Sequence, residues 1–102
     1  MAAELPRPDS IAGDPDATEM IRVWLAHNSP QLALRMGMWD EAGLDEREAW
    51  GILLADVVRH VGRGLAEQCG WDVDETTGRV LDSLLKHARD DRGPAEGRFR
   101  DG

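Results

Sequence analysis

Asp56 and His60 are the residues whose types and spacing come closest to a chemical site. They lie four positions apart in a stretch with helical periodicity, so their side chains should be neighbours on one helix surface. A carboxylate beside an imidazole is what a general-base dyad or half of a metal site needs. A metal site takes three or four ligands, however, and the other two histidines and the single cysteine are not spaced to supply them. Asp56 can equally pair with Arg59. We therefore interpret the pair as structural, and we predict no catalytic residue, metal or cofactor.

An alternative interpretation makes the protein a weak enzyme or a small-ligand sensor. The site would then combine Asp56 and His60 with Arg59 or Arg35 in a pocket between the hairpin and the helix described below, and tryptophans could form the pocket walls. The sequence contains neither GxGxxG nor GxxxxGKS, the spacings that cradle phosphate groups. Nothing in the sequence therefore indicates a nucleotide site.

Four tryptophans in 102 residues are a second unusual feature. Trp24 is flanked on its predicted strand face by Arg22 and Arg35, an aromatic and cationic combination that is enriched at interfaces. The alternative is that the second helix covers this face. Trp39 lies in a connector, and Trp50 is predicted to pack beneath it. The residues that we consider candidates for interaction are Arg22, Trp24, Arg35, Trp39, Trp50, Asp56, Arg59 and His60.

Residues 18–36 are predicted to contain a β-hairpin. Apolar residues alternate with polar ones over 21–25 and again over 32–36, which is the period of a strand with one buried face. Residues 27–30, His-Asn-Ser-Pro, would form a loop of about four residues. The alternative is a pair of short helices, one capped by Thr18 and one opened by Ser29 and Pro30.

Two helices should follow a connector over residues 37–44. Asp45 is a suitable N-cap for the first helix, and Gly70 is a suitable stop. Asp72 or Asp74 would begin the second helix, which the Gly-Pro pair at 93–94 would end. The side chains predicted to face the core are Trp50, Leu53, Leu54, Val57, Val58, Val61 and Leu65 in the first helix and Val80, Leu81, Leu84, Leu85 and Ala88 in the second.

Small residues follow one line of the first predicted helix. Gly51, Ala55, Gly62 and Ala66 are spaced by four, seven and four positions. Each glycine inside a helix costs about 0.8–1 kcal/mol relative to alanine, so a close approach of another backbone should offset that cost. The neighbour would be the hairpin, the second helix or the same helix of a second subunit.

These elements predict an α+β fold: an antiparallel hairpin followed by two helices in two layers. Residues 1–17 and 93–102 are expected to be disordered, because they are rich in proline, glycine and charge. The single domain would span residues 18–92. A core of this size is marginal, and a two-stranded sheet has unpaired edges. We therefore predict a homodimer in which a second copy completes the sheet.

Charge and composition narrow the range of partners. The net charge is −8, without a dense basic stripe, so no nucleic-acid partner is expected. No segment approaches the roughly 20 apolar residues of a membrane span, and the N-terminus does not resemble a signal peptide. The single cysteine, Cys69, excludes an intrachain disulfide, which fits a cytoplasmic protein.

Residues 49–60 contain the pattern Ala-Trp-Gly-Ile-Leu-Leu-Ala-Asp followed by His60. Together with residues 21–24 and 37–40, this pattern resembles a family of short bacterial proteins classified as a domain of unknown function. The resemblance covers roughly residues 18–90, and it implies a small α+β domain with no assigned activity. The chain departs from that pattern at Gly62 and Gly64 and at the additional residues 41–44. The expected function is that of a non-enzymatic, homodimeric protein-interaction or accessory module.

Overall fold

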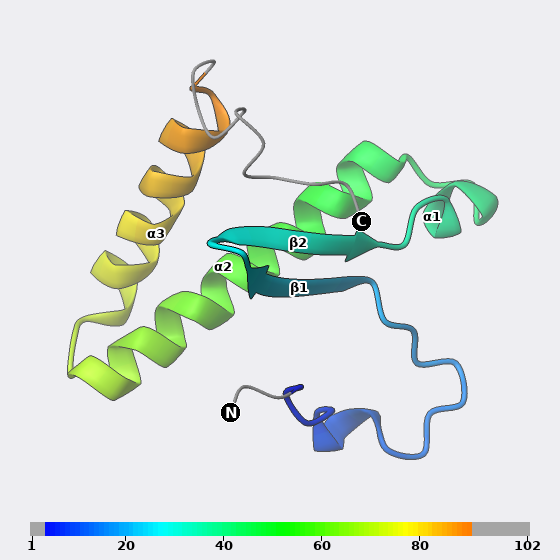
Figure 1. Cartoon of the computed structure of the whole chain (residues 1–102), viewed down its shortest axis with the longest axis horizontal. Helices are drawn as coiled ribbons and strands as arrows, with labels where there is room; N and C mark the ends of the chain where they lie inside the picture. Colours follow the sequence, from blue (N-terminus) through cyan, green and yellow to red (C-terminus); the bar gives the residue numbers. More distant parts are fainter. Residues whose placement is uncertain (1–3, 91–102) are drawn as a thin grey trace.

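The computed structural model describes residues 4–90 and consists of a β-hairpin followed by helices (Figure 1). The hairpin strands are β1 (Ile21–Ala26) and β2 (Ser29–Leu34). The helices are α1 (Met38–Glu41), α2 (Glu46–Cys69) and α3 (Val73–Ala88), and a short 3-10 helix, η1 (Asp9–Ile11), precedes β1. This order confirms the predicted α+β class and the hairpin rather than two short helices. The predicted tail at residues 93–102 lies outside the described residues.

The hairpin has a tighter turn than the sequence predicts. The strands pair antiparallel from Ile21 opposite Leu34 to Ala26 opposite Ser29, so only His27 and Asn28 remain in the loop. Both have positive φ, 55° and 64°, as a type I′ turn requires. The predicted loop of about four residues is therefore wrong: the I′ backbone twist matches that of the strands, so pairing continues to the two turn residues.

The ends of the two long helices follow from their capping residues. The Asp45 carboxylate accepts a hydrogen bond from the Arg47 backbone N–H, and Gly70 ends α2 in the left-handed conformation at φ 73°. The Asp72 carboxylate accepts from the Glu75 N–H at 2.8 Å and begins α3. Asp45 and Gly70 were predicted from the sequence, and of the two candidates for the second helix, Asp72 and Asp74, the structure selects Asp72. Helix α3 ends at Ala88, before the Gly-Pro pair predicted to stop it. The short helix α1 lies in the predicted connector.

Helices α2 and α3 cross where the chain is most tightly packed. The buried residues of this crossing are Val58, Gly62 and Ala66 of α2 and Thr76 of α3. Thr77 approaches Gly62 so closely that a Cβ atom at Gly62 would lie 2.8 Å from the Thr77 Cβ and 2.9 Å from its Cα. Of the predicted line of small residues, Gly62 and Ala66 are buried at this crossing, whereas Gly51 and Ala55 are exposed.

The hairpin does not pack on the helices of its own chain. Figure 1 draws the hairpin in front of α2, but within residues 4–90 no Cα atom of either strand comes within 8 Å of a helix Cα atom. Val58 is buried as predicted, but much of the predicted core faces of α2 and α3 is uncovered. Leu54, Val57 and Val61 of α2 remain exposed, as do Leu81 and Leu84 of α3. The prediction that these side chains are buried within one chain is wrong, because no second layer covers them.

Candidate interaction surfaces

One face of the hairpin is entirely apolar, and half of its residues are exposed to solvent while the other half are only partly buried. The register and the alternation of side chains along a strand place six residues on this face. We call it the hairpin face: Ile21, Val23, Leu25, Pro30, Leu32 and Leu34. None of the six is buried, and Val23 and Leu25 are 52% and 82% exposed. A strand normally buries such a face on a core, and no helix within residues 4–90 packs closely on this one.

A second apolar surface runs along α2. Leu54, Val57, Val61 and Leu65 are spaced by three, four and four positions, which places them on one side of the helix. We call these four residues the α2 stripe. Each is exposed, from 38% for Leu65 to 43% for Val61. A helical face of this kind normally lies against a core, so the α2 stripe is a further apolar surface left uncovered among the described residues 4–90.

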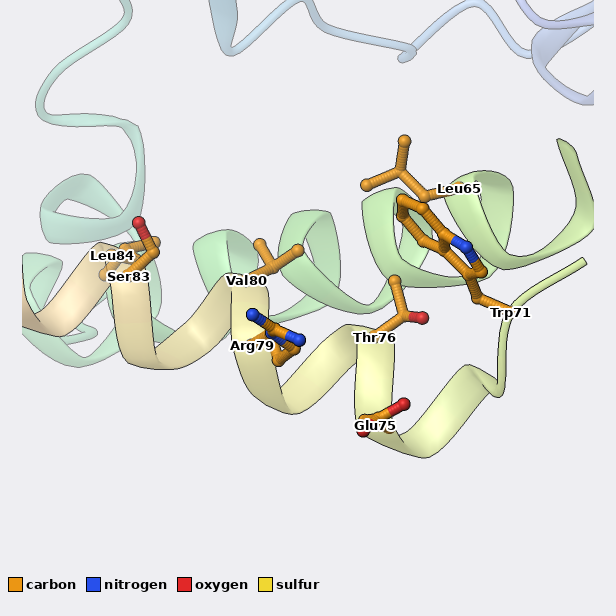
Figure 2. A pocket seen from close by; sticks show the side chains of 8 residues that line it. All are labelled: Leu65, Trp71, Glu75, Thr76, Arg79, Val80, Ser83 and Leu84. Atoms are coloured by element: carbon orange, nitrogen blue, oxygen red, sulfur yellow. The ribbon is translucent and has the colours of Figure 1, made fainter. Parts of the chain in front are cut away.

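The α2 stripe continues into a groove between α2 and α3 (Figure 2). The groove has a volume of about 830 Å³. Its lining residues are Leu65, Trp71, Glu75, Thr76, Arg79, Val80, Ser83 and Leu84. The Trp71 ring lies beside Leu65 at one end of the groove in Figure 2, and 57% of Trp71 is exposed. The groove therefore offers an apolar floor with polar groups of α3 at its edge.

Trp24 lies on the opposite face of the hairpin, and no helix covers it. It is 40% exposed and pairs across the strands with Gln31. The neighbouring Arg22 binds the Glu19 carboxylate at 3.1 and 3.0 Å and Glu4 at 3.0 Å. The hydrogen bond and the charge of Glu19 raise the pKa of Arg22, with a further contribution from Glu4. Arg35 donates to the Glu19 backbone oxygen at 3.0 Å. Both arginines are thus held by the segment before β1, and the charge of Arg22 is partly neutralised by Glu19 and Glu4.

Trp39 and Trp50 meet beside Glu46 and join α1 to the start of α2. Their rings contact edge to face, with centroids 5.5 Å apart. The Glu46 carboxylate accepts hydrogen bonds from the backbone N–H groups of Trp39 and Asp40 at 2.8 and 3.0 Å, and from the Trp50 indole at 3.2 Å. Partial desolvation of Glu46 acts to raise its pKa, but the backbone N–H groups of Gly37, Asp40 and Trp39 and the Trp50 indole outweigh it, so the pKa of Glu46 is lowered. This cluster is structural, as the sequence predicts for Trp50.

Asp56, Arg59 and His60 form an exposed group on α2. The Asp56 carboxylate lies 3.0 Å from Arg59 Nη2 and 3.5 Å from His60 Nδ1. His60 Nδ1 lies closer, at 2.8 Å, to the Asp56 backbone oxygen. All three side chains are more than half exposed, and the groove described above contains none of them. An exposed pair of this kind contributes little to stability.

The structure does not bring the eight candidate residues into one site. They fall into three separate groups: the Trp24 face, the Trp39–Trp50 cluster and the Asp56 group. The groove was missed, although Trp71 directly after the Gly70 cap was a visible signal. Within residues 4–90, no group of three or more His, Cys, Asp or Glu side chains is placed to hold a metal ion. In the same range, no helix combines the length and apolar character needed to cross a bilayer.

These features define a small α+β domain whose apolar surfaces remain open on both its hairpin and its helices. The chain belongs to the family described as "Domain of unknown function (DUF5076)", whose sequence profile matches residues 4–91. This confirms the resemblance to a domain of unknown function. The comparison with curated proteins gave no significant match.

A solved structure from the photosynthetic bacterium Rhodopseudomonas palustrus CGA009, described as a "putative pyruvate dehydrogenase", has a similar fold. The match has a TM-score of 0.62 and 24% sequence identity, and it covers 86% of this chain and 95% of the other. At this identity the similarity extends to the fold alone. It shows that the arrangement of hairpin and helices recurs in a second chain.

Proposed function

We propose that this protein is a non-enzymatic homodimer that acts as a protein-interaction or accessory module. The observation that carries the proposal is that the hairpin face and the α2 stripe are both open to solvent in a single chain. Exposed apolar surfaces of this extent mark sites of protein association. A short domain that leaves them open has little core with which to stabilise itself.

The placement of the polar residues supports binding rather than catalysis. Asp56 and His60 are solvent-exposed on the outside of a helix, where a general base gains neither desolvation nor a positioned substrate. The Trp24 face, with its exposed ring, is the surface that we propose for a further protein partner. Trp and Arg are among the residues enriched where proteins bind one another.

Light scattering coupled to size-exclusion chromatography tests the proposal on the full chain. A homodimer has a mass of 22.6 kDa, twice the 11.3 kDa of one chain. We expect the dimer mass at micromolar protein concentration. A mass of 11.3 kDa across the micromolar range would refute the proposal. Binding of a metal ion or metabolite that is lost in His60→Ala would instead support the enzyme or sensor alternative.

A further inference from the structure

We infer that the dimer forms by reciprocal exchange, in which the hairpin face of each subunit covers the α2 stripe and the adjoining groove of its partner. This inference rests on the proposed homodimer and adds the surfaces that meet. A twofold axis would use the contact twice, because each chain carries one hairpin face and one α2 stripe. The hairpin face of each chain would thereby bury the α2 stripe of the other chain.

The two surfaces match in length and in chemistry. A six-residue strand such as β1 extends about 20 Å. The α2 stripe spans twelve residues from Leu54 to Leu65, a rise of about 16 Å along the helix, and Trp71 extends the apolar surface beyond it. The hairpin face carries no polar side chain, so it can lie on an apolar stripe without leaving a polar group unpaired.

The apolar area available to the two contacts approaches that of a standard interface at the upper end of its range. A fully exposed aliphatic side chain corresponds to about 60–120 Å² of apolar surface. Nine apolar side chains of the hairpin face, the α2 stripe and the groove are exposed. Scaled by their exposed fractions, they supply about 500–1,000 Å² of apolar surface over the two symmetric contacts. They are Val23, Leu25 and Leu34 of the hairpin face, the four residues of the α2 stripe, and Trp71 and Leu84 of the groove. A standard interface buries about 1,600 Å², of which roughly 60% is apolar.

The other symmetric arrangements leave apolar surface exposed. Pairing of two hairpins edge to edge satisfies backbone groups but leaves both faces of the sheet open, including Leu25 at 82% exposure. Packing of one α2 stripe on another covers the helices but not the hairpins. Exchange covers both surfaces with a single kind of contact, which is why we favour it over either alternative.

Cross-linking between differently tagged chains tests the exchange. Both chains carry Cys69→Ser, because Cys69 is free and exposed. One tagged chain carries Leu25→Cys, the other carries Val61→Cys, and the two are co-expressed and treated with a short bis-maleimide. The matched control replaces Val61→Cys by Arg63→Cys, two positions along the same helix and therefore on its other side. We expect the mixed product with Val61→Cys to exceed that with Arg63→Cys at least fivefold.

Two outcomes would overturn the exchange while leaving the dimer intact. One is equal cross-linking of Val61→Cys and the Arg63→Cys control. The other is preferential cross-linking of Leu25→Cys to itself, which would place hairpin against hairpin. A monomer mass in light scattering would refute the proposed function as well. Should a variant fail to show the wild-type circular dichroism spectrum, the pair Val23→Cys and Leu65→Cys tests the same contact.

Discussion

The crossing of α2 and α3 makes a prediction about Gly62 that opposes helix propensity. Alanine in a helix is favoured over glycine by about 0.8–1 kcal/mol. At Gly62 the added Cβ would lie 2.8 and 2.9 Å from Thr77 Cβ and Cα, and it would also collide with Thr77 Oγ1. The Thr77 Cα atom belongs to the backbone, so α3 itself would have to move. Overpacking of this kind costs about 1–3 kcal/mol.

Gly64 provides the matched control on the same helix. A Cβ atom there would meet nothing within 4 Å. Because alanine is favoured over glycine in a helix, Gly64→Ala should raise the free energy of unfolding by about 0.8–1 kcal/mol. The free energy of unfolding of Gly62→Ala should therefore be about 1–3 kcal/mol lower than that of Gly64→Ala. For a domain of this size the difference corresponds to at least about 4 °C in melting temperature.

Urea unfolding followed by circular dichroism measures this difference at one fixed protein concentration, since stability depends on concentration in a dimer. Combining Gly62→Ala with Thr77→Ala should restore part of the loss, because the substitution removes the Oγ1 atom but leaves Cα and Cβ in place. Equal stability of Gly62→Ala and Gly64→Ala would refute the close crossing of the two helices.

Two further predictions concern the Glu46 cluster and the hairpin turn. Because the folded-state pKa of Glu46 lies below its unfolded value of about 4.3, ionised Glu46 stabilises the fold above that pH, and this contribution is lost as the pH falls through the folded-state pKa. Tryptophan fluorescence should therefore change on acidification in the wild type and in the control Glu48→Gln. The fluorescence of Glu46→Gln should be altered already at pH 7. Identical pH profiles of all three proteins would contradict a stabilising role of ionised Glu46. In the turn, Asn28→Val should lower stability by about 1–2 kcal/mol, because a β-branched residue is strained at φ 64°, whereas Asn28→Gly should be tolerated. Urea titrations that find the two Asn28 variants equally stable would argue against the type I′ turn.

The boundaries of the helices were predictable because they depend on local chemistry. Asp45 and Asp72 each accept a hydrogen bond from a backbone N–H two or three residues further on, and Gly70 adopts the left-handed conformation that favours glycine. The alternation of apolar residues likewise predicted the hairpin. Its turn was less predictable, because a His-Asn pair lacks the glycine typical of a type I′ turn.

The candidate surfaces could be predicted only in part. The apolar positions of the α2 stripe follow from helical periodicity, and the contact of Trp50 with the connector was expected. Trp71 after the Gly70 cap was the one local signal for the groove; its shape was not predictable, because Leu65 and Leu84 come together only where α2 and α3 pack on each other. Asp56 and His60 are neighbours, as their spacing requires, but spacing does not reveal whether a helix surface faces solvent or a pocket.

The amino-acid sequence by itself determined the type, order and capping of the elements, because hydrogen bonds and side-chain periodicity within a few residues decide them. Tertiary structure alone decided which apolar faces are covered. The small residues at Gly62 and Ala66 let α3 approach α2, but the hairpin remains apart from both helices. Burial depends on contacts between residues distant in sequence, and a periodic apolar pattern is the same whether its partner lies in the same chain or in another.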